Sequence, residues 1–383
     1  MRRMGMIAAL LACFVMVIAG CGKKDAGAVV KDLSKLQEKT DTYQGTGTMT
    51  LHTASQPLQY KVDIKFQKPN YYRIALTNEK KDLTQIVLRN DEGVFVLTPS
   101  LNKIFRFQSN WPEDNGQVYL YQTLLSSILK DNSRQFADDK ENYVFDVMAN
   151  YPNTSLTRQK IWLSKSDYAP KQVEVLDSNS AVLVDVKFDS FKFNEKLDKS
   201  VFDTKTNLST SPASGAEATT AVPEGQDGGA SSGKEAEGAA GTEGNGGKDG
   251  ATSGEQEGSD PAADSSSSSF IPMEPSYLGP VGIALKDSSD IEFGGNPGVM
   301  FRYGDADGNY SYTLIETQPQ DVDAATGSGS IIDLGFTMGQ LSEGEQQTLV
   351  WTYSGTEFRL TSGNLPEAEL IKVAQSVVDE MTK

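Results

Sequence analysis

A long low-complexity segment constrains the fold of this chain more than any other feature. Residues 207–269 contain no aromatic side chain and consist almost entirely of Gly, Ala, Ser, Thr, Glu and Asp. Such a composition cannot bury enough apolar surface to offset the entropy lost on ordering. The sequence therefore predicts a disordered acidic linker at 207–269, which divides a folded part at 27–206 from a second one at 270–383.

Charge is distributed unevenly over these three parts. Residues 25–206 carry 24 acidic and 24 basic side chains, the linker carries 11 acidic and two basic, and residues 270–383 carry 17 acidic and five basic. The whole chain has a formal net charge of −17. Binding to a nucleic-acid backbone depends on clustered Lys and Arg, so nucleic acid is excluded as the expected partner.

The N-terminus has the pattern of an export signal. Two arginines precede an apolar run at 6–18, which is shorter than the about 20 residues that span a bilayer. The run ends in Ile18-Ala19-Gly20-Cys21, which resembles the lipobox of bacterial lipoproteins. This resemblance implies a signal peptide at 1–20, lipidation of Cys21 with acyl chains such as palmitate, and a short tether at 21–26. The expected location is extracytoplasmic, on the cell membrane; a secretory signal with an incidental cysteine is the alternative.

Cysteine and histidine are too scarce for several kinds of chemistry. Processing would remove Cys13 and acylation would consume Cys21, which excludes disulfides, thiolate metal sites and cysteine nucleophiles. His52 is the single histidine of the chain. It lies in an alternating run, on the face opposite Met49 and Leu51, and we interpret it as a solvated strand residue rather than a catalytic base.

Hydrophobic periodicity predicts that residues 27–206 are mainly β. Apolar residues from Val29 to Leu36 have helical spacing, whereas residues 58–66 alternate strictly between apolar and polar side chains. A second helix is predicted at 118–129. Further strands are predicted at 46–53, 72–76, 84–89, 94–97, 103–107, 143–148, 159–164, 172–176 and 181–191. About ten strands with two helices predict a strongly curved antiparallel sheet.

Several segments in this order resemble the LolA-like lipoprotein-carrier superfamily, including lipid-anchored Gram-positive members associated with sporulation and germination. They are residues 65–73, 90–99, 162–164, 170–174 and 197–202. The resemblance implies an open half-barrel, lidded by helices, whose apolar concave face receives acyl chains. It also makes Lys68 a candidate lid contact, at a position where the carriers commonly have arginine. Lysine lacks the planar bidentate group of arginine, so the locking mechanism would differ.

The alternation also predicts which residues lie on the concave face. Candidate ligand-cavity residues are Met49, Leu51, Val62, Ile64, Phe66, Tyr72, Ile74, Leu76, Ile86 and Leu88. A curved sheet closed by helices can also be filled by its own side chains. Both interpretations stay open on the sequence alone.

Residues 270–383 predict a small sheet backed by a helix. Alternating runs occur at 299–303, 310–317, 331–337, 348–353 and 357–361. After Pro366, an apolar stripe from Leu370 to Met381 has helical spacing, and acidic residues occupy its first turn. This part is similar to a domain of unknown function in exported and sporulation-associated proteins. The overall class expected is thus mainly β (α+β).

No motif marks a catalytic, cofactor or metal site. Asp305, Asp307, Asn309 and Glu316 have the offsets of calcium ligands in an EF-hand loop, but Tyr310 stands where that loop needs glycine. Asp307-Gly308 between two alternating runs instead predicts a β-hairpin, with weak calcium binding as the alternative.

Two functional hypotheses follow. The first is a membrane-anchored, non-enzymatic protein that binds acyl chains, lipid or a lipoprotein during envelope or spore biogenesis. The second is a two-domain envelope sensor or regulator that binds a membrane protein partner. An enzyme would have to rely on carboxylates, and the sequence marks out no pair of them.

Overall fold

A computed structural model describes residues 24–53, 56–107, 111, 116–149, 151, 153, 155–209, 272–318, 329–342 and 344–378. The predicted signal peptide, Cys21 and most of the predicted linker lie outside the described residues. Contacts group the segments Met1–Pro212 and Phe270–Lys383 into a single compact unit. Within the part of the chain that the structure describes, no helix is both long and apolar enough to cross a bilayer.

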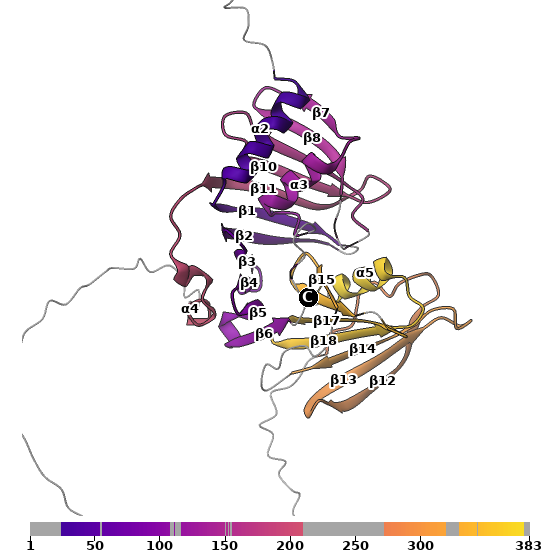
Figure 1. The fold of residues 1–383 in the computed structure, drawn as a ribbon. Coiled ribbons are helices and arrows are strands. Elements are labelled where there is room, and N and C mark those ends of the chain that lie inside the picture. Colours follow the sequence, from indigo (N-terminus) through magenta and orange to yellow (C-terminus); the bar gives the residue numbers. More distant parts are fainter. Residues whose placement is uncertain are drawn as a thin grey trace, which may run out of the picture. The chain divides into compact units, whose positions relative to one another are not determined.

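The N-terminal part forms one open, eleven-stranded antiparallel sheet with strand order β6-β5-β4-β3-β2-β1-β11-β10-β9-β8-β7 (Figure 1). Its strands are β1 (Thr42–His52), β2 (Pro57–Gln67), β3 (Tyr71–Asn78), β4 (Leu83–Asn90), β5 (Gly93–Thr98), β6 (Lys103–Phe107), β7 (Gln135–Asp138), β8 (Asn142–Met148), β9 (Arg158–Ser164), β10 (Pro170–Leu176) and β11 (Val182–Phe193). A single-turn 3-10 helix, η1 (Pro99–Leu101), precedes β6. The predicted fold class, an open antiparallel sheet with few helices, is confirmed.

Strict alternation decides which side chains of this sheet are buried. Along β2 the buried residues are Leu58, Tyr60, Val62, Ile64 and Phe66, and the residues between them are exposed or half-buried. We call the face that carries these side chains the inner face. It packs into one hydrophobic cluster with the two predicted helices.

Those helices are α2 (Ala26–Lys39) and α3 (Tyr121–Lys130). The Asp25 side chain caps α2 by accepting a hydrogen bond from the Ala28 N–H, as an N-terminal Asp typically does. Val29 and Leu33 of α2 and Leu124 and Ile128 of α3 are fully buried in the cluster with the inner face. Each helix therefore presents one apolar stripe to the sheet.

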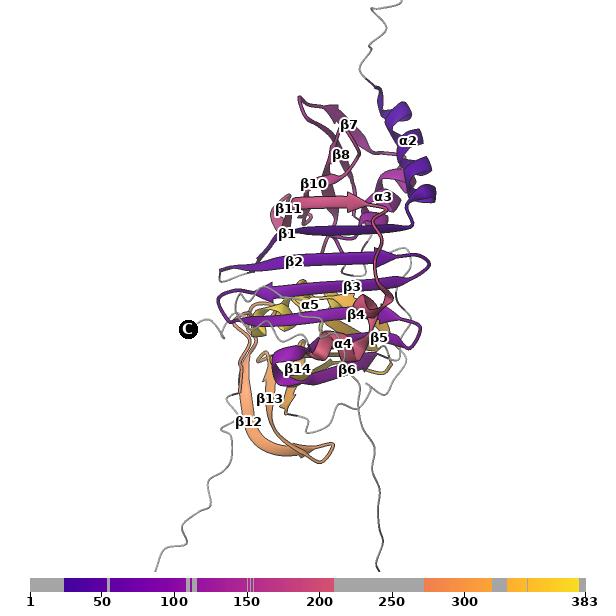
Figure 2. The same ribbon diagram turned by 90° about the vertical axis from the view of Figure 1, so that its left-hand side faces the viewer.

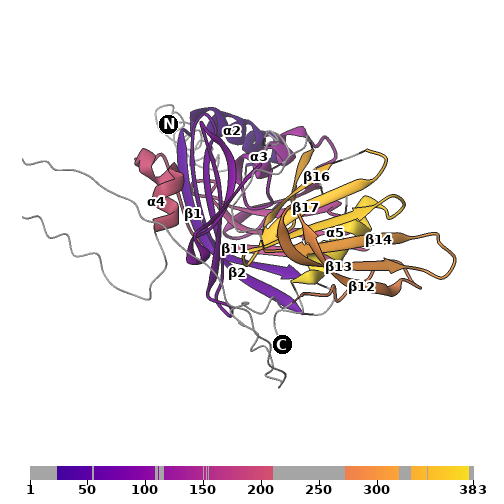
Figure 3. The same cartoon turned by 90° about the horizontal axis from the view of Figure 1, so that it is seen from below.

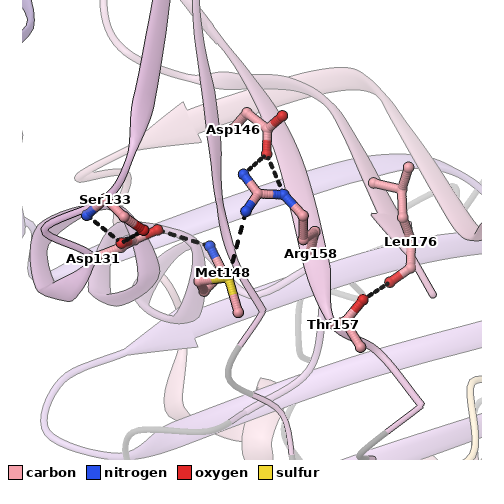
Figure 4. A network of polar contacts seen from close by, with 7 residues as sticks. All are labelled: Asp131, Ser133, Asp146, Met148, Thr157, Arg158 and Leu176. Atoms are coloured by element: carbon pink, nitrogen blue, oxygen red, sulfur yellow. Dashed lines mark hydrogen bonds and ion pairs between the residues drawn. The ribbon is translucent and has the colours of Figure 1, made fainter. Parts of the chain in front are cut away.

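A polar network attaches the end of α3 to the sheet (Figure 4). Asp131, which follows α3, accepts hydrogen bonds from the Ser133 N–H (2.6 Å) and from the Met148 N–H of β8 (2.8 Å). Arg158 of β9 donates from Nε to Asp146 of β8 at 3.0 Å. The bond from Met148 links the residue after α3 to β8, and the bond from Arg158 joins β8 to β9.

The other face of strands β3–β5, the outer face, is covered by a short segment after β11. This segment comprises the 3-10 helix η2 (Lys199–Phe202) and α4 (Thr204–Ser209). In the view of Figure 2, α4 is drawn in front of β4–β6. Asn207 is buried there and accepts a hydrogen bond from Arg73 Nε at 2.7 Å. The predicted linker boundary at 207 is therefore corrected, because the folded part extends to Ser209.

The C-terminal part forms a seven-stranded antiparallel sheet with order β12-β13-β14-β18-β17-β16-β15, visible in orange and yellow in Figure 3. The predicted final helix is present as α5 (Glu367–Val377). The strands are β12 (Ala284–Phe293), β13 (Asn296–Gly304), β14 (Ser311–Thr317), β15 (Ser330–Asp333), β16 (Met338–Ser342), β17 (Gln347–Tyr353) and β18 (Thr356–Ser362). A sheet packed with one helix was the predicted arrangement, whereas β12 and β16 were not predicted.

Candidate functional site

The structure brings together most of the residues predicted for the concave face. Eight of the ten are buried in one hydrophobic cluster on the inner face. They are Met49, Leu51, Val62, Ile64, Phe66, Tyr72, Ile74 and Leu76. Their proposed role as a ligand cavity remains a prediction.

Ile86 and Leu88 were assigned to the wrong face. Ile86 pairs with Ala75, whereas Ile74 pairs with Val87, so Ile86 and Leu88 point to the outer face. There they form a separate small cluster with Ala75, Phe95 and Leu97. β4 is apolar on both faces, and a shift of one residue exchanges the faces of a strand, so alternation alone cannot assign its direction.

The inner face is covered by two different parts of the chain. α2 and α3 cover one portion, and the C-terminal sheet packs against another. Residues 334–338, between β15 and β16 and at the start of β16, include the fully buried Leu334 and Phe336. These residues, together with β17 and α5, contact the N-terminal sheet. We call this contact the seam.

Contacts at the seam join residues that are far apart in the chain. Gly335 lies so close to Leu51 that a Cβ added there would come within 3.0 Å of Leu51 Cδ1. Gln85 Nε2 donates to the Thr352 carbonyl at 3.0 Å, and Lys81 Nζ donates to the Val378 carbonyl at 3.3 Å. The inner face is therefore largely a closed core in this structure.

An apolar pocket of about 270 Å³ remains at the seam. Its N-terminal wall contains Leu51, Val118, Leu156, Leu183 and Val184, and its C-terminal wall contains Tyr277, Asp333, Lys372, Gln375 and Ser376. Among the ten predicted cavity residues, only Leu51 lines it. Ligand pockets commonly measure about 300–1,000 Å³, so this seam pocket has room for part of an acyl chain.

Polar groups lie on both walls of the seam pocket, and His52, Thr53, Asn153 and Ser155 belong to the N-terminal one. Burial raises the pKa of Asp333 to about 6, although the carboxylate accepts a hydrogen bond from the Gly335 N–H at 2.7 Å. The Gln375 amide donates to the Leu334 carbonyl at 3.2 Å, and Lys372 pairs with Glu369 at 3.0 Å. The pocket thus combines aliphatic side chains of the N-terminal part with polar groups from both parts.

Lys68, the predicted lid contact, lies at the C-terminal end of α2. Its Nζ donates to the Glu38 carbonyl at 2.6 Å and pairs with Asp41 at 3.2 Å. A cation is favoured at this position because carbonyls without helical partners face outward at a helix C-terminus. Lysine thus contacts the helix through a single ammonium group, without a bidentate pair.

The other residues considered from the sequence have structural roles here. His52 is exposed at the end of β1, as expected, at the rim of the seam pocket. The predicted hairpin is confirmed, because β13 and β14 pair around the turn at Gly308. Glu316 is buried within β14, away from that turn. In the described ranges, no three His, Cys, Asp or Glu side chains gather as a metal site would require.

Sequence reasoning missed the seam residues other than Leu51. Gln85 is buried on the inner face between Leu83 and Val87. A polar side chain in an apolar strand indicates a specific hydrogen-bond partner. Leu334-Gly335-Phe336 places two large apolar residues in a turn, which is a second signal for a contact. Neither signal identifies the partner segment.

Comparison with known proteins identifies relatives of the whole chain. The model of the family described as "Sporulation protein YdcC-like" matches residues 1–202, and that of a domain of unknown function (DUF4367) matches residues 286–377. The sporulation protein YdcC of Bacillus subtilis (strain 168) is 34% identical over 373 residues, which cover 96% of this chain and 95% of that protein.

Solved structures show more distant similarity. The crystal structure of MucB matches with a TM-score of 0.30 and 13% identity, covering 93% of this chain and 98% of that one. A LolA superfamily protein from Nitrosomonas europaea matches with a TM-score of 0.28 and 11% identity, covering 48% of this chain and 99% of that one.

Proposed function

Because the chain belongs to the YdcC-like sporulation proteins, we propose that it is a non-enzymatic binding protein of the sporulating cell, held on the membrane by a lipid on Cys21. Its proposed ligand is an acyl chain of a lipid or lipoprotein. The observation that carries this proposal is the apolar pocket at the seam. Each methylene group buried there contributes about 0.8 kcal/mol.

The mixture of aliphatic and polar side chains in the seam pocket suits an amphiphilic ligand. The aliphatic side chains of Leu156, Leu183 and Val184 would contact the chain, while Gln375 and Lys372 would lie near a polar head. A longer stretch of acyl chain requires more room than about 270 Å³. We therefore expect full binding to be coupled to movement of the C-terminal sheet away from Leu51.

Two glutamate substitutions test the pocket. Leu156→Glu places a carboxylate among the aliphatic side chains of the pocket, where its burial opposes acyl binding by several kcal/mol. Met148→Glu is the matched control, because Met148 is 49% exposed and does not line the pocket. Titration with a fluorescent fatty acid should show binding to the unaltered chain and to Met148→Glu, and a loss of binding in Leu156→Glu.

Circular dichroism establishes that the variants are folded. A folded Leu156→Glu protein that binds the probe as tightly as the unaltered chain would contradict an acyl site at the seam. Native mass spectrometry of the unaltered chain provides an independent measurement, because a bound acyl species adds a defined mass.

A second candidate function is a regulator that binds a membrane protein. The closed inner face favours it, since the C-terminal sheet already occupies much of the surface that a carrier would offer to lipid. A regulator should bind one protein at 1:1 stoichiometry and contain no lipid. Cross-linking on intact membranes, followed by mass spectrometry, distinguishes the two functions.

A further inference from the structure

A second pocket, of about 390 Å³, lies where the end of α2 and one side of α3 meet the turn between β2 and β3. It shares no lining residue with the seam pocket, so it is independent of the proposed acyl site. Three cationic side chains line it: Lys68, Arg89 and Lys130. None of its lining residues, all of which are described, is Asp or Glu. We call it the cationic pocket.

This charge pattern departs from that of the whole chain. Residues 25–206, which contain the pocket, carry equal numbers of acidic and basic side chains, whereas the cationic pocket gathers three positive groups from three separate elements. Asp41 outside the pocket pairs with Lys68 and offsets part of that charge. Arg89 and Lys130 add two further cations from β4 and from the end of α3.

An amide completes the donor set. The Gln122 Oε1 accepts a hydrogen bond from the Tyr43 hydroxyl at 2.5 Å, which orients the amide so that its two N–H groups are its remaining donors. Gln122 is half-buried and lines the pocket, and no acceptor for its Nε2 is found among the described residues. The site thus offers Arg, Lys and amide donors together.

Buried aromatic side chains form the apolar part of the same pocket. Phe66, Tyr72 and Tyr121 line it and are at most 7% exposed. The rings of Phe66 and Tyr72 lie 4.9 Å apart, so they provide a packed surface for an organic group. The volume falls in the range common for small-molecule sites.

We propose that the cationic pocket binds a phosphate monoester or diester. Its phosphate would contact Arg89, Lys130 and the Gln122 amide, and its organic part would pack on Phe66 and Tyr72. Arg forms paired hydrogen bonds with phosphate, and Lys adds a point charge, which together suit a group with several oxygens. The ester is the headgroup of an anionic phospholipid or a soluble phosphate ester.

The test uses the full chain carrying Cys21→Ala and two probes. Isothermal titration calorimetry measures binding of glycerol phosphate, and co-sedimentation measures binding to phosphatidylglycerol vesicles, with phosphatidylcholine vesicles for comparison. Arg89→Gln and Lys130→Gln should each raise the dissociation constant about tenfold or more, because each removes a charge-assisted hydrogen bond. The controls Arg106→Gln and Lys171→Gln remove exposed cations outside the pocket and should leave the dissociation constant unchanged.

The outcomes separate the two sources of the ester. Selective binding to phosphatidylglycerol vesicles that weakens in Arg89→Gln supports a lipid headgroup, and binding of glycerol phosphate alone supports a soluble ester. Unchanged affinity in both folded pocket variants, or no binding of either probe to the unaltered pocket, would overturn the proposal. Equal affinity for butyrate would also overturn it, since a carboxylate would then suffice.

Discussion

The side-chain amide of Gln85, on β4, donates a hydrogen bond to the Thr352 carbonyl, on β17, at 3.0 Å. Gln85 is only 2% exposed, so this bond satisfies a donor that has no access to water. It links the N-terminal sheet to the C-terminal sheet, two parts separated in sequence by the predicted linker. The seam is thus specified by polar as well as apolar contacts.

Substitution of Gly335 should destabilise the seam. Gly335 has a φ of +84°, and an added Cβ would lie 3.0 Å from Leu51 Cδ1. Gly335→Ala therefore incurs both the strain of the left-handed conformation, about 1–2 kcal/mol, and an overpacking cost of about 1 kcal/mol or more. Chemical denaturation monitored by tryptophan fluorescence measures the resulting decrease in the free energy of unfolding.

Gly308→Ala is the matched control for this measurement. Gly308 has a similar φ of +75°, but no atom lies within 4 Å of an added Cβ. The control should therefore show the backbone cost alone. If both variants lost the same free energy, the close approach of Gly335 to Leu51 would be contradicted.

Cleavage of the predicted linker should not separate the two sheets. Its composition predicts that a protease cuts first between residues 210 and 269. The pieces should still elute together in size-exclusion chromatography, because the seam buries apolar side chains from both. Elution as two separate species, each folded by circular dichroism, would argue against a stable seam.

Stability should decrease with rising pH because of one buried carboxyl group. Burial raises the pKa of Glu316 to about 8. The charge of Glu274 acts in the same direction. The Met273 N–H opposes the shift, because it donates a hydrogen bond to Glu316 Oε2 at 2.9 Å. A carboxyl group whose folded pKa is raised stabilises the fold when protonated. That stability is present below the unfolded pKa, about 4.5, and is lost as the pH rises towards 8.

The expected slope is up to about 1.4 kcal/mol per pH unit over that window. Glu316→Gln should remove most of the slope above pH 6. Burial also raises the pKa of Asp333, to about 6, and that of Glu357, so these two groups account for the slope that remains. The free energy of unfolding is measured at intervals from pH 5 to pH 8.5. Glu292→Gln, at an exposed position, should retain the slope; a slope that persists in Glu316→Gln would exclude Glu316 as its source.

Replacement of Cys21 should release the protein from the membrane. Cys21→Ala removes the predicted site of acylation, and we expect stable anchoring to depend on the two acyl chains predicted there. Fractionation of cells should then place the protein in the soluble fraction or show an uncleaved precursor. A Cys21→Ala protein that resists a high-salt wash of the membranes would contradict lipid anchoring through this residue.

Local sequence patterns were sufficient to predict most elements of this fold. The alternation in β2 places its apolar side chains on one face whatever the partner strand, and the stripe of Leu370, Val373 and Val377 defines the buried side of α5. The hairpin at Gly308 follows from the turn residues themselves. In each case the signal lies within a few neighbouring residues.

For Ile86 and Leu88, such local signals do not predict which face of the sheet the side chain occupies. Both faces of β4 are apolar, so the direction of each side chain depends on the register with β3, which alternation in β4 alone does not define. Asn207 similarly has the composition of a linker residue, yet its hydrogen bond with Arg73 places it in the folded part.

The sequence by itself determined the mainly β class and most of the helices and strands, whereas the export signal and the acidic linker remain predictions. Only the tertiary structure decided that the inner face is closed by the chain's own C-terminal sheet, and that Lys68, Arg89 and Lys130 meet around one pocket. The physical reason is distance along the chain. Gln85 and Thr352, or Leu51 and Gly335, come together through complementary surfaces, which no local pattern of either segment encodes.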